Sequence, residues 1–329
     1  MNTTAGVAAT ASKSCAGCRT AIWVCSVQTA TLKRSSASFR PSPPVDAALQ
    51  VLVGLPERDK LAAGQPPCYK SIMFDWLKRR ARHRLLSMPF PDDWSGILSR
   101  NVKHYSLLTE TDQAKLRDDL RVLVAEKNWE GCGGLTITDE AKVTIAAQAS
   151  LLLLGFQDKY FEMVESILVY PDAFIAPDHT EISEGLELVG ESSNEGETRY
   201  RGPVVLSWPD VLAGGRCESG GSNLVVHEFA HQLDMENGDL GDGTPLLANR
   251  VQYDRWQRVM QAEYEGLARD CRRGRSTLLD CYGATDIEEF FAVATECFVQ
   301  QPSQMHHRLP KLYELLSEFF RQDPAGRVK

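Results

Sequence analysis

The sequence lacks features that would place the protein in several common classes. No apolar run approaches the roughly 20 residues of a membrane-spanning helix, and the best candidate, residues 146–156, suits a buried core helix. Cationic residues are not in excess, because 36 Lys and Arg face 44 Asp and Glu for a formal net charge of −8. That balance argues against a nucleic-acid partner, whose phosphates favour a basic surface. No internal repeat is visible. We therefore predict a monomeric globular protein with no membrane or nucleic-acid partner.

The sequence also lacks a cysteine pattern typical of a disulfide framework. Its nine cysteines are odd in number and scattered, and a chain of 329 residues does not need covalent cross-links. Cys15 and Cys18 form a CxxC pair, but no second pair follows at the spacing of a zinc ribbon. We expect reduced thiols in a reducing compartment and predict a cytoplasmic protein.

Acidic residues are absent from residues 1–45, which contain five cations and few large apolar side chains. Such a segment buries too little surface to offset the entropy of ordering. Its composition is similar to that of a transit peptide, whereas Met73 opens a segment that reads as a natural start of the chain. We predict that residues 1–72 form a disordered extension and residues 73–326 one folded domain.

The apolar pattern of that domain predicts an α+β fold, and 43% hydrophobic residues suffice for a sizeable core. Residues 107–127 have a helical stripe, and Thr138 can cap a central helix that runs to residue 154. Residues 166–170 and 204–208 read as strands that prolines close. Residues 181–202 suggest hairpins and loops. We expect a small mixed sheet, an active-site helix and a mainly helical C-terminal part.

The most informative motif is a His-Glu-x-x-His sequence at residues 227–231. On a helix, His227 and His231 lie one turn apart on one face, so both imidazoles can reach one metal ion. Glu228 is turned about 100° away and can take a proton from metal-bound water. Ser222 or Asn223 can cap this apolar helix. The alternative is an amphipathic helix that carries two histidines by chance.

A catalytic zinc needs a third protein ligand and an open position for water. No third histidine follows at the HExxHxxGxxH spacing, and we expect His306 and His307 to be solvated. Asp234 lies on the same face as His227, although a role beside the metal or at the end of the helix suits it better. The favoured candidate is Glu289, in an apolar helix that Thr285 or Asp286 can cap, with Glu296 on the same stripe. A carboxylate in such an apolar helix usually needs a partner, which favours Glu289 as a metal ligand. We expect Glu288 to face solvent.

Three separated motifs resemble the Mlc titration factor A family of zinc metallopeptidases. They are residues 202–208, residues 225–234 and residues 282–291, and the resemblance covers roughly residues 74–326. It implies a zincin fold with a catalytic domain of the lethal-factor type. It implies one Zn²⁺ ion per chain bound by His227, His231 and Glu289, with Glu228 as general base and Tyr282 facing the reacting carbonyl.

The resemblance also implies aminopeptidase-like activity on a peptide substrate and binding of Mlc, a glucose-responsive transcriptional repressor, as a partner. Two classes of function therefore compete. The protein is either a working peptidase or a non-catalytic protein that binds a regulator and has a supporting zinc site. The intact Glu228 favours the peptidase, because a structural zinc site needs no base. A structural site with cysteine ligands, drawn from Cys281 and Cys297, is a third alternative.

Overall fold

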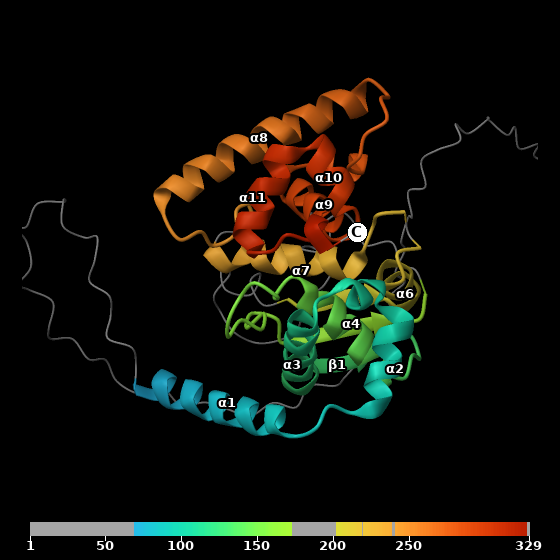
Figure 1. The fold of residues 1–329 in the computed structure, drawn as a ribbon, viewed down its shortest axis with the longest axis vertical. Coiled ribbons are helices and arrows are strands. Elements are labelled where there is room, and N and C mark those ends of the chain that lie inside the picture. Colours follow the sequence, from blue (N-terminus) through green and yellow to red (C-terminus); the bar gives the residue numbers. More distant parts are fainter. Residues whose placement is uncertain (1–68, 173–201, 219, 239–240, 328–329) are drawn as a thin grey trace, which may run out of the picture. The chain divides into compact units, whose positions relative to one another are not determined.

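The structure is a computed structural model that describes residues 69–172, 202–218, 220–238 and 241–327. Most of these residues are helical (Figure 1). The elements are α1 (Tyr69–Ser87), α2 (Asp92–Asn101), η1 (Lys103–Leu107), α3 (Glu110–Glu126), β1 (Asn128–Gly131), α4 (Asp139–Leu151), β2 (Ser166–Tyr170), β3 (Val204–Ser207), α6 (Trp208–Gly215), α7 (Leu224–Asp234), η3 (Met235–Asn237), α8 (Arg250–Arg272), η4 (Cys281–Ala284), α9 (Ile287–Gln300), α10 (Pro302–Arg308), α11 (Pro310–Phe320) and η5 (Ala325–Arg327).

Described residues from Phe90 onward form one compact unit, and α1 belongs to a second unit. Helix α1 begins before residue 73, so it crosses the boundary that we predicted for the folded domain. The predicted extension otherwise falls outside the described residues, and its disorder stays a prediction. Among the helices that the structure describes, none has the length and apolar character needed to cross a bilayer.

The strands β1, β2 and β3 form a sheet in that order, and both pairings are parallel. Ile167 pairs with Trp129 on one side and with Val204 on the other. Our prediction of a mixed sheet is therefore wrong for the described strands. The physical reason is that β1 reaches β2 through helix α4, and a helical crossover brings two strands parallel. The expected hairpins of residues 181–202 fall, except for Gly202, outside the described residues.

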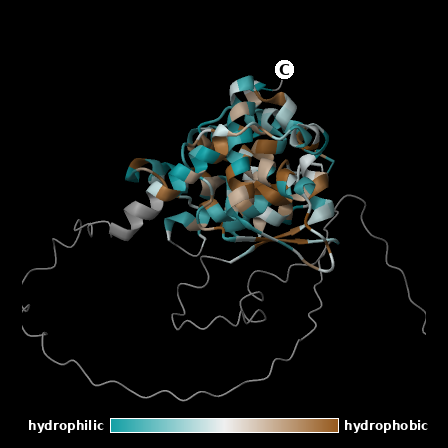
Figure 2. Cartoon of the chain, turned by 90° about the horizontal axis from the view of Figure 1, so that it is seen from below, coloured by the Kyte–Doolittle hydropathy of each residue, from teal (hydrophilic) through white to brown (hydrophobic). Residues whose placement is uncertain are grey.

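Helix α4 is the central element of the compact unit, as its all-round apolar sequence predicts. Thr138 caps it by accepting a hydrogen bond from the Ala141 amide, and α2, α3, α6 and α7 all contact it. The helix ends at Leu151 rather than at residue 154, because Leu152 and Leu153 donate to carbonyls only three residues back. In Figure 2, brown hydrophobic segments lie in the middle of this unit and in parts of its sheet.

Aromatic side chains join the C-terminal helices. The Trp256 ring of α8 packs edge-on against Phe291 of α9 and Phe319 of α11, and Phe298 stacks on Phe320. Helix α11 begins at Pro310 and buries a helical stripe that includes Leu312, Leu316 and Phe320. Helices α7 and α9 pack side by side (Figure 1). That contact brings the two segments with candidate metal ligands together.

Candidate metal centre

Helix α7 holds the first two candidate ligands in a buried position. Asn223 caps the helix, since its side chain accepts a hydrogen bond of 3.0 Å from the Val226 amide. The Asn223 amide group also donates to the Gln148 side chain of α4 at 2.9 Å. The apolar face of α7 is buried, with Val226 and Phe229 almost inaccessible. The helix thus starts at a fixed point in the core and directs both histidines toward α9.

Helix α9 delivers the third candidate from another part of the chain. Asp286 caps this helix by accepting a hydrogen bond of 2.9 Å from the Glu289 amide. Phe290 and Phe291, which follow Glu289, are fully buried. They fix the rotation of the helix, so the Glu289 carboxylate faces α7, where it is only 3% exposed.

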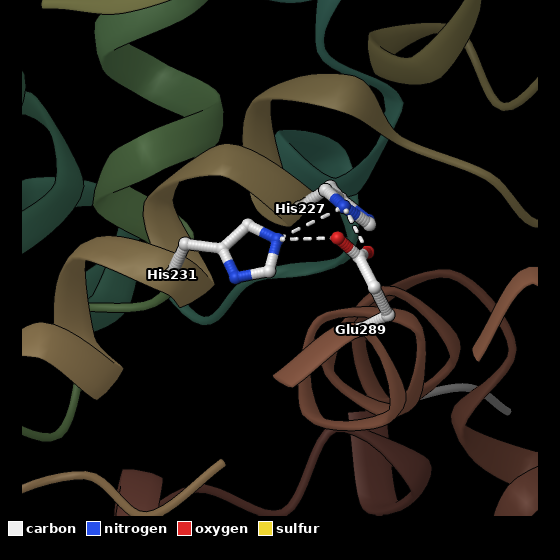
Figure 3. A group of neighbouring side chains, drawn as sticks. All are labelled: His227, His231 and Glu289. Carbon is white, nitrogen blue, oxygen red and sulfur yellow. Dashed lines mark hydrogen bonds and ion pairs between the residues drawn. The ribbon is translucent and has the colours of Figure 1, made fainter. Parts of the chain in front are cut away.

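The structure brings the three predicted ligands together (Figure 3). His227 Nε2 lies 3.0 Å from Glu289 Oε2 and 3.2 Å from His231 Nε2, and His231 Nε2 lies 3.6 Å from Glu289 Oε1. Ligand atoms at zinc distances around a tetrahedral ion stand about 3.3 Å apart. The observed spacing and the donor set of two imidazoles and one carboxylate therefore fit a zinc ion. In the described part of the chain, these residues form the only such cluster.

Glu296 supports this cluster from one side. Its Oε1 lies 2.8 Å from His227 Nδ1, and its Oε2 accepts the backbone amide of Asn223. A hydrogen bond from Nδ1 leaves Nε2 free of a proton and directed at the ion. Sequence reasoning placed Glu296 on the stripe of Glu289 but gave it no role. The seven-residue spacing was the signal that could have identified it.

The electrostatics of the cluster favour a cation. Burial lowers the pKa of His227, but hydrogen bonds with Glu289 and Glu296 outweigh burial and raise that pKa well above its ordinary value. The negative charge of Glu228 acts in the same direction. A divalent ion between the three ligand atoms satisfies the same field.

Tyr282 and Glu228 flank the cluster. The Tyr282 ring centroid lies 6.0 Å from that of His227, and the Tyr282 side chain is 43% exposed. Partial burial raises the pKa of Tyr282, and the charge of Glu289 and a hydrogen bond with it raise that pKa further. The phenol therefore stays protonated across the physiological range. Glu228 is half-buried beside His227.

Other polar residues of the two motifs have structural roles. Asp234 ends α7 and is fully buried, and its Oδ2 accepts a hydrogen bond of 2.9 Å from the Gly243 amide. This confirms the predicted role at the end of the helix. Glu288, which we expected to face solvent, is half-buried against the loop at Gly241. His306 and His307 are exposed, as predicted.

One disulfide corrects our expectation of reduced thiols. Cys271, near the end of α8, is bonded to Cys281, at the start of η4, with their Cα atoms 5.8 Å apart. The reversal of the chain at Gly274, where φ is 63°, brings the two close. The alternative of cysteine ligands fails, because Cys281 is cross-linked and the buried Cys297 is not part of the metal-ligand cluster.

Comparisons with known proteins agree with this geometry. A family model described as glucose-regulated metallo-peptidase M90 matches residues 75–321. An uncharacterized protein of Synechocystis sp. is 33% identical over 255 residues, which cover 76% of this chain and 90% of the relative. Mlc titration factor A of Yersinia enterocolitica is 31% identical over 237 residues, which cover 70% of this chain and 85% of the relative. The protein of the same name from Yersinia pestis is 29% identical over 231 residues, covering 70% and 84%.

Proposed function

The chain belongs to the M90 family of glucose-regulated metallopeptidases, and we propose that it hydrolyses peptide bonds at one zinc ion bound by His227, His231 and Glu289. The observation that carries this proposal is the convergence of the three ligand atoms, which all lie within 4.8 Å of one another. Two imidazoles and one carboxylate are a ligand set of catalytic zinc. When bound, such an ion lowers the pKa of its water and polarises the scissile carbonyl. We further propose a zincin-type fold for the domain.

Glu228 and Tyr282 have the roles that the reaction leaves to the protein. Glu228 follows His227 on α7, so its carboxylate can accept the proton of the attacking water and later deliver it to the leaving amine. Tyr282 donates a hydrogen bond to the carbonyl oxygen of the scissile bond as negative charge develops there. The raised pKa of Tyr282 supports this role, because only the protonated phenol is a donor.

An extended peptide along β3 is the substrate geometry that we propose. β3 is the last strand in the order of the described sheet and contacts α7, so a peptide added beside it passes the metal centre. Val205 is the partly exposed residue of this strand. A photo-crosslinking residue at position 205 should capture an extended peptide inhibitor. Capture only at sites remote from the metal centre would refute strand addition.

Aminopeptidase specificity, binding of a Mlc-like repressor and a cytoplasmic location complete the proposal. The names of the Yersinia relatives support the repressor, because both are Mlc titration factor A. The alternative is a protein that binds a regulator and does not catalyse. Glu228→Gln separates the two, since it should abolish hydrolysis of an aminoacyl reporter and leave repressor binding intact. Hydrolysis that persists in this variant would contradict the role of Glu228.

Metal analysis tests the ligand set directly. The purified chain should contain one zinc ion per molecule, and His227→Ala and Glu289→Ala should each lose it while circular dichroism shows a retained fold. Glu228→Gln is the matched control, because it lies between the ligands in sequence and should keep the metal. Zinc retained at full occupancy in both alanine variants would overturn the assignment.

A further inference from the structure

A cavity of about 330 Å³ lies at the C-terminal end of α9 and shares no residue with the metal-ligand cluster. Its walls come from η1, the end of α4, the segment after α6, and the last turns of α9 and α11. The apolar lining includes Leu108, Leu152, Phe298 and Phe320, each of which is buried. Leu107, which is 42% exposed, also lines the cavity and marks its solvent side.

The charged residues that line this cavity are cations. Lys103 and Arg327 both line it, whereas no Asp or Glu does. Arg327 forms an ion pair with Asp112 at 3.3 Å, and Lys103 forms none within the described ranges. Burial lowers the pKa of His104, and the charges of Lys103 and Arg327 lower it further. Both cations therefore lie near the same imidazole. His104 is thus held neutral and lies 3.6 Å from the Cys217 thiol.

We propose that this cavity binds a small amphipathic carboxylate. The leucine and phenylalanine walls bury the apolar body of such a molecule, which is the main source of affinity in small-molecule sites. The carboxylate meets Lys103 and Arg327 at the polar end, where it shares Arg327 with Asp112. A neutral molecule gains no contact with the charge of Lys103, and a cation is repelled by it.

Decanoate, titrated below its micellar concentration into the full-length protein, is the probe. The protein is stripped of metal, because a carboxylate can also ligate zinc. Calorimetry should show saturable binding of one decanoate per chain, and decanol should bind at least about tenfold more weakly, the factor of one lost charge contact. Absence of saturable binding would overturn the proposal. Binding seen only in the metal-loaded protein would do the same.

Leu107 supplies a matched pair of variants at the cavity. Because this side chain is partly exposed, Glu or Gln can replace it without disturbing the core. Leu107→Glu places a negative charge beside the bound carboxylate and should weaken decanoate binding at least about tenfold relative to Leu107→Gln, which matches its size without the charge. Lys103→Gln should weaken binding in the same direction. Equal affinities in the two Leu107 variants, with melting curves that confirm folding, would place the ligand elsewhere.

Discussion

The carboxylate of Glu296 lies 2.8 Å from Nδ1 of His227, on the side of the imidazole opposite the Glu289 carboxylate. Glu296 therefore acts on the metal centre through His227. It accepts two hydrogen bonds at once, from the imidazole and from the Asn223 amide. A residue that holds a ligand in its metal-binding orientation tunes affinity without touching the ion.

Glu296→Gln should weaken zinc affinity by about 10- to 100-fold, the usual effect of removing such a partner. His227 and Asn223 bond to different oxygens of Glu296, and glutamine replaces one of these oxygens with an NH2 group, which cannot accept. Competition with a chelator, followed by metal analysis, measures the change. Glu314→Gln, on the exposed face of α11, is the control for the lost charge. Equal zinc affinities in the two variants would show that Glu296 does not support His227.

Tyr282→Phe should lower kcat on the order of a hundredfold with little change in KM, because a donor to the developing oxyanion acts in the transition state. Zinc content should stay at one per chain, since Tyr282 is not a ligand. Steady-state kinetics on a peptide reporter give the two constants. If Tyr282 serves only for packing, the variant keeps kcat, because phenylalanine retains the ring.

Asp119 predicts a specific dependence of stability on pH. Burial raises its pKa to about 6, although Lys115 pairs with it at 2.7 Å. Because the folded pKa exceeds the unfolded one, the native state binds more protons between about pH 4 and 6, and stability falls as pH rises through that window. Asp119→Asn should remove this loss and be about 1–3 kcal/mol more stable than the wild type above pH 7.

Urea unfolding of both proteins at pH 4.5 and pH 7.5 measures this difference. The advantage of Asp119→Asn should shrink at the lower pH, where the wild-type carboxyl is protonated. Asp118→Asn is the control, because that neighbouring side chain is 53% exposed. An advantage that is constant with pH would arise from packing and not from proton binding.

Reduction of the Cys271–Cys281 disulfide should destabilise the unit that contains η4. Its sequence separation of 10 gives a loop whose closure in the unfolded chain corresponds to about 3 kcal/mol. Dithiothreitol should therefore lower the melting temperature of the wild type and leave that of Cys271→Ser unchanged. Cys132→Ser, which removes a thiol outside the disulfide, should still respond to dithiothreitol. A wild type that is insensitive to the reductant would contradict a stabilising cross-link.

The metal ligands were predictable because their signals are local. The spacing of His227 and His231 is a property of one helix, and Glu289 stands out as an acid in an apolar helix. What the sequence does not contain is the packing of α7 on α9. The partners of Glu296 depend on that contact, so they follow only from the structure.

The sheet and the disulfide were harder for the same reason. β1 is four residues long and contains Asn128, Glu130 and Gly131, residues that are depleted in strands. Its pairing with β2 comes from the crossover through α4, not from its own pattern. The Cys271–Cys281 bond depends on a reversal of the chain at Gly274, and cysteine spacing alone does not show it.

Asn223 links three helices at one point, because it caps α7, donates to Gln148 of α4 and offers its amide to Glu296 of α9. The support of His227 is thereby continuous with α4, the central helix of the domain. These contacts connect the metal ligand directly to the core, so a disturbance of one is transmitted to the other. On heating the zinc-loaded protein, we expect zinc release and global melting to occur as a single cooperative event.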